Sequence, residues 1–447
     1  MNNSFFRGDE YKKLNKYQKR VVLSRRKNIL LLASAGTGKT STIVMRIKYL
    51  TEVLKINKKE ILCISFTNEA VNSLRKKIDI PNIYTFHKLA LNIIGKKHEI
   101  LSEDLLTDIV MKSYNNKVLL SLFNMPKLEI YKLIVTFINL FKSNGYDIET
   151  FYKMINRSTG KNKILLTEIM KCYICYESYL KEENLIDFND MINLAIKYVD
   201  KININYKYII IDEFQDTSLN KFKLINKIRK KCHANILAVG DDYQSIYRFT
   251  GSNINIITNF KWYVFFTKVY KLKYTYRNSK ELNYVALKFI NKNPVQIRKK
   301  VKSYISVNNP IEIIYYDNLD KKVKEVIKED NLKNICILSR NNKDLENISL
   351  NVSKMSVHKS KGLEFDNIIL INVNNNMNGF PNKYNDHYIL KYVNRYKEYY
   401  PHEEERRLFY VALTRCKKKI YVFAPKNNES IFIKEIKKYK NVIIRKK

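Results

Sequence analysis

The stretch of sequence that decides the fold is NILLLASAGTGKT, residues 28–40. Ile29 to Leu32 form an apolar run typical of a buried strand, and apolar residues then recur at Ile43, Ile47 and Leu50 with the spacing of an amphipathic helix. The glycines between the two segments permit a tight turn whose backbone N–H groups face a phosphate at the helix N-terminus. This order of strand, glycine-rich loop and helix predicts a nucleotide-binding α/β domain.

The loop also supplies side chains suited to a nucleotide. Lys39 offers a positive charge to the β- and γ-phosphates, and Thr40 offers a hydroxyl to Mg²⁺. Ala33 stands where the usual pattern has its first glycine. The predicted nucleotide contacts of this segment are Ala33, Ser34, Ala35, Gly36, Thr37, Gly38, Lys39, Thr40 and Ser41.

A second motif, YIIIDEFQD at residues 208–216, places adjacent carboxylates directly after an apolar strand. Open α/β sheets bind ligands at this edge. One of the two carboxylates can hold Mg²⁺ while its neighbour acts as a general base that polarises a water. The alternative interpretation, a charged exit from a strand, is disfavoured by the phosphate loop upstream. The two motifs together predict nucleotide hydrolysis.

Composition limits the class of protein. With 447 residues the chain is long enough for about three domains of roughly 150 residues each. The net charge of +39 favours polyanions such as nucleic acid, although a chain rich in Lys, Asn, Ile and Tyr is also typical of AT-rich genomes, viral ones among them. The charge therefore permits a nucleic-acid partner without naming it.

No run of 18 apolar residues and no signal peptide is visible, so we expect a soluble intracellular protein without membrane contact, in cytoplasm or nucleus. Of the 6 cysteines, only Cys172 and Cys175 have metal-like spacing. No second pair accompanies them, so buried thiols are favoured over a metal site.

Further motifs follow along the chain, and in this order the set resembles the UvrD/Rep/PcrA family of superfamily 1 (1A) DNA helicases. They span nearly the whole sequence: SFTN at 65–68, TFH at 85–87, LIDF at 185–188, GDDYQSIYRF at 240–249, LKYTYR at 272–277, SVHKSKGLEF at 356–365 and EEERRLFYVALTR at 403–415.

The resemblance implies roles in ATP hydrolysis with Mg²⁺ as cofactor. Gln244 would sense the γ-phosphate, and Arg277 and Arg415 would be arginine fingers from a second motor domain that also contact the nucleotide. These residues would act with Lys39 and Glu213, and Thr40 and Asp212 would hold the metal. The remaining nucleotide contacts would be Gln18 on adenine, Tyr276 stacked on the base and Glu364 on the ribose.

The resemblance also implies single-stranded DNA and tailed duplex DNA as partners, and we expect a monomer whose protein partners the sequence does not name. Base contacts would come from Phe66, Tyr247 and Phe249, and phosphate contacts from Thr67, His87, Ser356 and His358. Stacking and phosphate contacts do not read the 2′-OH, so RNA stays open as an alternative.

The implied fold is α/β, with two RecA-like P-loop motor domains of mostly parallel sheet flanked by helices, and a helical insertion in the first. The first motor domain (1A) would comprise 1–88 and 199–266, the insertion (1B) 89–198 and the second motor domain (2A) 267–447. The accessory domain (2B) of full-length relatives would be reduced or absent between Arg277 and Ser356. The insertion core would include Leu105, Ile109, Leu133, Phe137, Leu140 and Phe141.

Other expectations mark where the chain departs from the family. Ser41 and the pair Phe249-Thr250 replace an arginine and a tryptophan-arginine pair, which suggests looser base selectivity and weaker DNA contact. After Arg415 we expect one strand, 420–423, and a basic helical tail.

The predicted function is an ATP-dependent single-stranded-DNA translocase and DNA helicase, with 3′ to 5′ polarity implied by the resemblance. A nucleic-acid-stimulated ATPase that displaces bound proteins without processive unwinding is the alternative. An inactive binding module is disfavoured, because the predicted catalytic side chains are all present.

Overall fold

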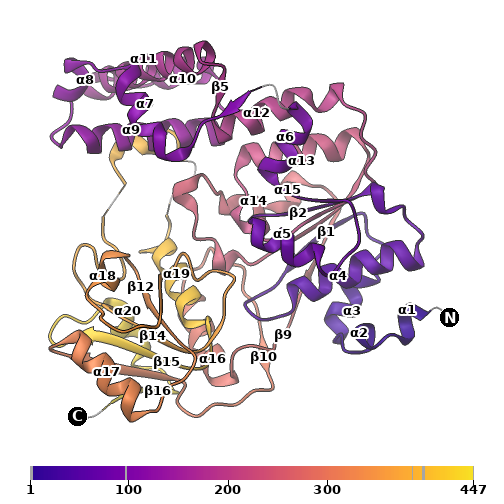
Figure 1. Cartoon of the computed structure of the whole chain (residues 1–447), viewed down its shortest axis with the longest axis vertical. Helices are drawn as coiled ribbons and strands as arrows, with labels where there is room; N and C mark the ends of the chain where they lie inside the picture. Colours follow the sequence, from indigo (N-terminus) through magenta and orange to yellow (C-terminus); the bar gives the residue numbers. More distant parts are fainter. Residues whose placement is uncertain (1–3, 96–97, 385, 395–397, 446–447) are drawn as a thin grey trace.

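The computed structural model describes residues 4–95, 98–384, 386–394 and 398–445. Figure 1 shows two α/β lobes and a helical insertion that projects from the first lobe. Each lobe is built on a six-stranded sheet in which every pairing is parallel. The predicted fold class, with its two motor domains and its helical insertion, is confirmed.

The first sheet carries the phosphate loop. Its strand order is β3-β2-β6-β7-β1-β8, with β1 Asn28–Leu32, β2 Ile61–Ser65, β3 Asn82–Thr85, β6 Tyr208–Ile211, β7 Asn235–Gly240 and β8 Thr267–Lys271. Leu30 and Leu32 point into one apolar core, and Ile29 and Leu31 into the core on the other face. This burial on both faces explains why the strands are continuous apolar runs rather than alternating ones.

Helices cover both faces of this sheet (Figure 1). The first helix after the phosphate loop is α4, Lys39–Lys48, and it continues into a π-helical turn at Tyr49–Val53 that contains the buried Leu50. Further helices of the lobe include α1 Ser4–Arg7, α2 Asp9–Lys12, α3 Lys16–Val22, α5 Asn68–Arg75, α13 Leu219–Lys231, α14 Ile254–Thr258 and α15 Phe260–Tyr263.

The predicted boundary between the motor domains, at residues 266 and 267, is one strand too early. β8 pairs with β1 in parallel, with Asn28 opposite Thr267 and Leu32 opposite Lys271, so it is the edge strand of the first sheet. None of the five residues of β8 is fully buried, so its sequence lacks the continuous apolar run of a core strand. The short strands β9, Tyr274–Thr275, and β10, Lys302–Ser303, then lead into the second lobe.

The second sheet has the order β13-β12-β14-β15-β11-β16. Its strands are β11 Ile311–Tyr316, β12 Ile335–Ser339, β13 Ser353–Ser356, β14 Phe365–Leu370, β15 Cys416–Pro425 and β16 Val442–Ile444, and its helices are α16 Lys280–Ile290, α17 Leu319–Glu329, α19 Glu403–Leu413 and α20 Ile431–Ile436. After Arg415, the sequence predicted one strand and a helical tail, and it missed a second strand, β16. β16 closes the sheet beside β11, and Phe432 and Ile433 of α20 are fully buried.

No separate domain interrupts the second lobe between Arg277 and Ser356, a segment that the structure describes throughout. Ser339 and Ser353 are joined by a loop that holds one short helix, α18 Lys343–Glu346. A reduced or absent accessory domain (2B) at this place stays a prediction from the family resemblance.

The insertion is a helical bundle with its own core. Its helices are α7 Leu106–Ser113, α8 Lys117–Ser121, α9 Lys127–Ser143, α10 Ile148–Asn156 and α11 Gly160–Glu182, and a two-stranded sheet of β4 Glu99–Ile100 and β5 Leu185–Ile186 stands at its base. The predicted limits 89–198 are too wide. Helices α6, Phe86–Ile94, and α12, Phe188–Tyr198, pack in the core of the first motor domain.

The predicted insertion core is correct except at Leu105. Ile109, Phe137, Leu140 and Phe141 are buried together, and Leu133 packs at their edge. Leu105 is 51% exposed, because the 3₁₀ turn Glu103–Leu105 shifts the phase before α7 begins and Leu106 points inward instead.

The 6 cysteines are all free thiols, and Cys172 is buried while Cys175 is half-buried. Among the residues that the structure describes, no helix is both long enough and apolar enough to span a bilayer.

Phe141 offers a test of the insertion core. Its ring is fully buried against Phe151 at 4.9 Å and Tyr173 at 5.4 Å between ring centroids. We expect Phe141→Ala to lower the free energy of unfolding by about 3–5 kcal/mol, because a cavity replaces the ring. The exposed Leu105→Ala is the control and should change it by less than about 0.5 kcal/mol. Thermal and urea unfolding measure both, and equal losses would contradict the observed core.

Candidate active site

The phosphate loop is shaped by its glycines and closed in by two distant segments. Gly36 and Gly38 have φ of 69° and 82°, a region that favours glycine. A Cβ on Gly36 would lie 2.4 Å from Cβ of Arg277, and one on Gly38 would lie 2.4 Å from Nε2 of Gln18. Ala33, by contrast, is not among the residues with positive φ, and its N–H continues the ladder to the Gly240 carbonyl at 3.0 Å. The missing first glycine is therefore tolerated.

Lys39 and the paired carboxylates meet at the carboxyl end of β6. The Lys39 ammonium donates to Oε1 of Glu213 at 2.6 Å, and the Glu213 N–H donates to Oδ1 of Asp212 at 2.9 Å. Gln215 donates to the other Glu213 oxygen at 2.6 Å. Both oxygens of the predicted general base thus have defined partners.

The two carboxyl groups have opposite pKa shifts. Burial and the neighbouring Glu213 charge raise the pKa of Asp212 from 3.8 to about 6. Burial also opposes ionisation of Glu213, but the charges of Lys39 and Lys361 outweigh it and lower the pKa of Glu213 to about 2. Glu213 is therefore ionised at neutral pH, as a general base must be.

The donor set fits Mg²⁺. Thr40 is the second residue of α4 and Asp212 directly follows β6, so a hydroxyl and a carboxylate, which are hard oxygen ligands, come from the two predicted positions. Lys39 pairs directly with Glu213, whereas Asp212 lies beside Glu213 and its pKa is raised, so a divalent cation would favour the ionised form of Asp212. The role of Thr40 and Asp212 as metal ligands remains a prediction.

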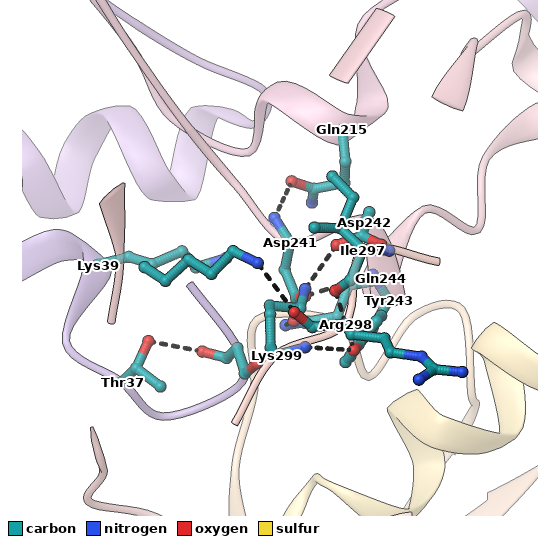
Figure 2. Close-up of polar contacts among 12 residues, drawn as sticks. Thr37, Lys39, Gln215, Asp241, Asp242, Tyr243, Gln244, Ile297, Arg298 and Lys299 are labelled. Atoms are coloured by element: carbon teal, nitrogen blue, oxygen red, sulfur yellow. Dashed lines mark hydrogen bonds and ion pairs between the residues drawn. The ribbon is translucent and has the colours of Figure 1, made fainter. Parts of the chain in front are cut away.

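The predicted sensor and arginine fingers come together. Gln244 donates to Oδ2 of Asp241 at 2.6 Å (Figure 2) and accepts from Nη2 of Arg415 at 3.1 Å. Burial, and then the charge of Arg277, lower the pKa of Arg415 to about 9, which leaves it charged at neutral pH. Arg277 itself lies against Gly36 and donates to Glu364 at 2.9 Å. Arg277 thus places its backbone and Cβ beside the phosphate loop while its guanidinium is held in the second lobe, whereas the Arg415 guanidinium reaches Gln244 of the first motor domain.

The predicted base-binding residues lie at one edge of the loop. Gln18 is buried and donates to the Thr37 carbonyl at 3.4 Å, while Tyr276 is 50% exposed. Asn15 joins them, because it caps α3 together with Gln18 and donates to the Tyr276 hydroxyl at 2.8 Å. Sequence analysis missed Asn15, although an Asn followed three residues later by Gln before a helix is a capping signal. Ser41 is exposed on α4.

A groove of about 1590 Å³ contains three of the predicted nucleic-acid contacts. Phe249, which is 60% exposed, Ser356 and His358 line it, and the Phe249 and His358 rings meet edge to face at 5.8 Å. Arg340 and Lys359 also line the groove and were not predicted, because single basic residues carry little signal in so basic a chain.

The other predicted contacts lie beside the groove lining rather than in it. Phe66 stacks on Tyr247 with centroids 5.6 Å apart and planes at 12°. The Thr67 hydroxyl caps α5 by accepting from the Ala70 N–H, and His87 packs on Phe188. Burial and the Lys221 charge lower the pKa of His87 to about 3, so this ring is neutral at physiological pH.

Lys361, which sequence analysis did not single out, joins the two halves of the site. Its ammonium donates to Oδ2 of Asp216 at 2.5 Å and to the Gln244 carbonyl at 2.7 Å. It also lies 4.7 Å from the centroid of the Tyr247 ring. A residue of the second lobe thus contacts the sensor segment and a predicted base-stacking aromatic together.

Comparisons with known proteins agree with this geometry. Residues 14–263 match the family described as the UvrD/REP helicase N-terminal domain, and residues 347–427 match the UvrD-like helicase C-terminal domain. The chain is 28% identical to DNA helicase IV of Escherichia coli (strain K12), over 99% of this chain and 72% of that protein. It is 26% identical to a probable DNA helicase of Mycoplasma pneumoniae, over 92% and 83% of the two chains. Against the ATP-dependent DNA helicase Rep of Buchnera aphidicola (strain Bp), the identity is 28% over 70% of this chain, which spans 48% of that relative.

Asp212→Asn should stabilise the protein at neutral pH. The raised pKa means that the folded state binds a proton more tightly than the unfolded state, so the carboxylate lowers stability progressively as pH rises from 3.8 to about 6. We expect the substitution to raise the free energy of unfolding by about 1–3 kcal/mol at pH 7.5 without Mg²⁺ or nucleotide, and the gain to vanish near pH 4.

Thermal unfolding as a function of pH measures this gain. Asp79→Asn is the control, because its side chain is 94% exposed and should alter stability little at any pH. Equal stability of wild type and Asp212→Asn at pH 7.5 would show that Lys39 already compensates the Asp212 charge in full.

Phe249→Ala should weaken binding of single-stranded DNA by about 5- to 150-fold, since stacking of one base on an aromatic ring contributes roughly 1–3 kcal/mol. Phe266→Ala is the matched control: this ring is 98% exposed just before β8, at the other end of the strands of the first sheet. Fluorescence anisotropy of a labelled oligonucleotide at constant salt measures both. Equal weakening by the two substitutions would remove Phe249 from the binding groove.

Proposed function

The chain belongs to the UvrD/REP helicase family, and from this premise we propose that it is an ATP-dependent DNA helicase that steps along single-stranded DNA. The observation that carries the proposal is the position of Lys361, which contacts Asp216 and Gln244 on the hydrolysis side and Tyr247 on the strand side. The polarity of 3′ to 5′ follows from the resemblance of the motifs to the family.

ATP is the proposed fuel. The backbone N–H groups of the phosphate loop and Lys39 would bind its phosphates, and Glu213, which is ionised at neutral pH, would take the proton of the attacking water. Thr40 and Asp212 would hold Mg²⁺, which offsets charge on the phosphate oxygens when bound. Arg277 and Arg415 would stabilise the charge that spreads over the transferred phosphoryl group.

Hydrolysis would be coupled to the strand through side chains that already touch. Loss of the γ-phosphate changes what Gln244 and Arg415 can bind, and these two residues are hydrogen-bonded to each other. The Gln244 carbonyl accepts from Lys361, whose ammonium lies over Tyr247. A change at the phosphate can therefore shift an aromatic ring that stacks on Phe66, and alternate grip on the bases would give stepping.

The groove supports a single strand as the track. Phe249 offers an aromatic face for a base, and Lys359 supplies positive charge along the same lining. Arg248 and Arg340 also line the groove, where carboxylates of the lining pair with them. Tailed duplexes are the proposed loading substrates, because a free tail can enter this groove. None of these contacts reads the 2′-OH, so the substrate test includes an RNA tail.

A second candidate is an ATPase that displaces proteins from nucleic acid without processive unwinding. The observation that favours it is the short loop between Ser339 and Ser353, where the lobe holds only α18. Without an accessory domain at this place, the motor has less surface with which to hold duplex DNA.

A strand-displacement assay beside an ATPase assay separates these functions. We expect single-stranded DNA to stimulate ATP turnover and a 3′-tailed duplex, unlike a 5′-tailed one, to be unwound. Arg415→Ala should keep ATP binding but lower turnover by about 10³-fold or more, because an arginine finger acts on the transition state. Stimulated turnover without displacement of either duplex would replace the helicase with the protein-displacing ATPase.

A further inference from the structure

Lys299 is buried at the carboxyl end of β7, a strand that is distant from it in sequence. It lies in the segment between α16 and β10, and its side chain is 1% exposed. Its ammonium contacts Oδ1 of Asp241 and donates to Oδ1 of Asp242 at 2.6 Å (Figure 2). Both carboxylates are fully buried, so Lys299 is an internal cation shared by two internal anions.

The segment that carries Lys299 also contacts Tyr243. Tyr243 follows Asp242 in the 3₁₀ turn Asp242–Gln244, which comes after β7. The Lys299 ammonium lies 3.6 Å from the centroid of the Tyr243 ring, and the Lys299 N–H donates to the Tyr243 hydroxyl at 3.0 Å. The Ile297 N–H donates to the second oxygen of Asp242 at 2.8 Å. The ring of Tyr243 packs in the core of the second lobe against Tyr410, at 5.3 Å. The loop and the turn are therefore held together on several sides.

Asp241 connects this cluster to the hydrolysis site. Its Oδ2 atom accepts from Gln244, and its N–H donates to Oε1 of Gln215 at 2.9 Å. Gln244 continues to Arg415, and Gln215 donates to Glu213. Two residues therefore separate the Lys299 ammonium from Arg415, namely Asp241 and Gln244. Asp241 and Gln215 likewise separate it from Glu213.

Charge makes this arrangement depend on the lysine. Adjacent buried carboxylates repel each other, and burial raises the pKa of Asp242 while the Lys299 charge opposes that rise. Without the ammonium, one carboxyl group must take up a proton or turn toward water. Asp241 is the carboxylate that accepts from the Gln244 side chain. If Asp241 is protonated or turns toward water, the position of Gln244 changes with it.

We infer that Lys299 is a positioning residue for ATP hydrolysis: it fixes Asp241, and through Asp241 it holds Gln244 where it meets both Arg415 and the γ-phosphate. The inference rests on the proposed function and adds a residue that lies outside every motif of the family resemblance. A simpler role is neutralisation of buried charge for stability alone. The two roles differ in whether turnover returns when the charge balance is restored.

Three variants of the full chain test the inference. Lys299→Met removes the ammonium, and Lys300→Met is the matched control, because the adjacent Lys300 is exposed. The double variant Asp242→Asn with Lys299→Met removes one negative and one positive charge and so restores the balance. The readouts are the single-strand-stimulated kcat, the KM for ATP, equilibrium binding of a fluorescent ATP analogue and thermal unfolding.

We expect Lys299→Met to lower kcat by about 10- to 100-fold, as misplacement of a reacting group does, while KM and analogue binding change little. Lys300→Met should match wild type. The double variant should recover thermal stability but not kcat, because Asp241 still lacks the cation that fixes it.

Two results would overturn the inference. One is a Lys299→Met kcat equal to that of Lys300→Met, and the other is recovery of kcat together with stability in the double variant. Wild-type turnover is measured first: absence of stimulated ATPase there contradicts the proposed function, whereas normal wild-type turnover with an active Lys299→Met contradicts only the role of Lys299.

Discussion

The structure depends on pairing the acids that are buried where β6 and β7 end. Burying an unpaired carboxylate costs several kcal/mol, so each needs a cation close by. Lys39 pairs with Glu213 from within the first lobe, and its charge also acts on Asp212. Lys361 and Lys299 come from beyond β8 in sequence and pair with the other three acids. The buried acids at the ends of β6 and β7 therefore have a second role: through Lys361 and Lys299 they hold the second lobe against the first. The acids in question are Asp212, Glu213, Asp216, Asp241 and Asp242.

Sequence predicted the parts of this site that local pattern encodes. An apolar strand, a glycine loop and a helix identify the phosphate site, because each segment carries its own periodicity. Lys299 has no such signal: it is one lysine among 82 Lys and Arg residues, and only the folded chain brings it to Asp241. The errors have the same origin. β8 and β16 are edge strands with weak burial patterns, and Leu105 lost its core position to a change of helical phase that spacing does not reveal.

The short second lobe reaches the insertion by another route. Residues 386–394, between β14 and α19, cross to the helical bundle (Figure 1), where Ile389, Leu390 and Val393 join its core. The Asn144 amide donates to the Val393 carbonyl at 2.7 Å. Several lining residues of the groove belong to this crossing segment, among them His387 and Lys391. With no domain between Ser339 and Ser353, this segment gives the second lobe a contact with the insertion beside the proposed track.

The solvent exposure of the side chains distinguishes ion pairs whose partners can be exchanged from ion pairs that stay formed. Arg277 is paired with Glu364, whose side chain is 43% exposed, and an ion pair this accessible contributes little, so a phosphate can displace the carboxylate at small cost. Lys299 has two partners that water does not reach, and breaking both contacts would leave two buried carboxylates without a cation. In the proposed nucleotide cycle, Arg277 would therefore exchange its partner, while the lysine cluster at the end of β7 would stay intact. A motor needs both kinds of contact. Exchangeable ion pairs let the nucleotide change the interface between the lobes, and buried ion pairs keep the rest of that interface in place.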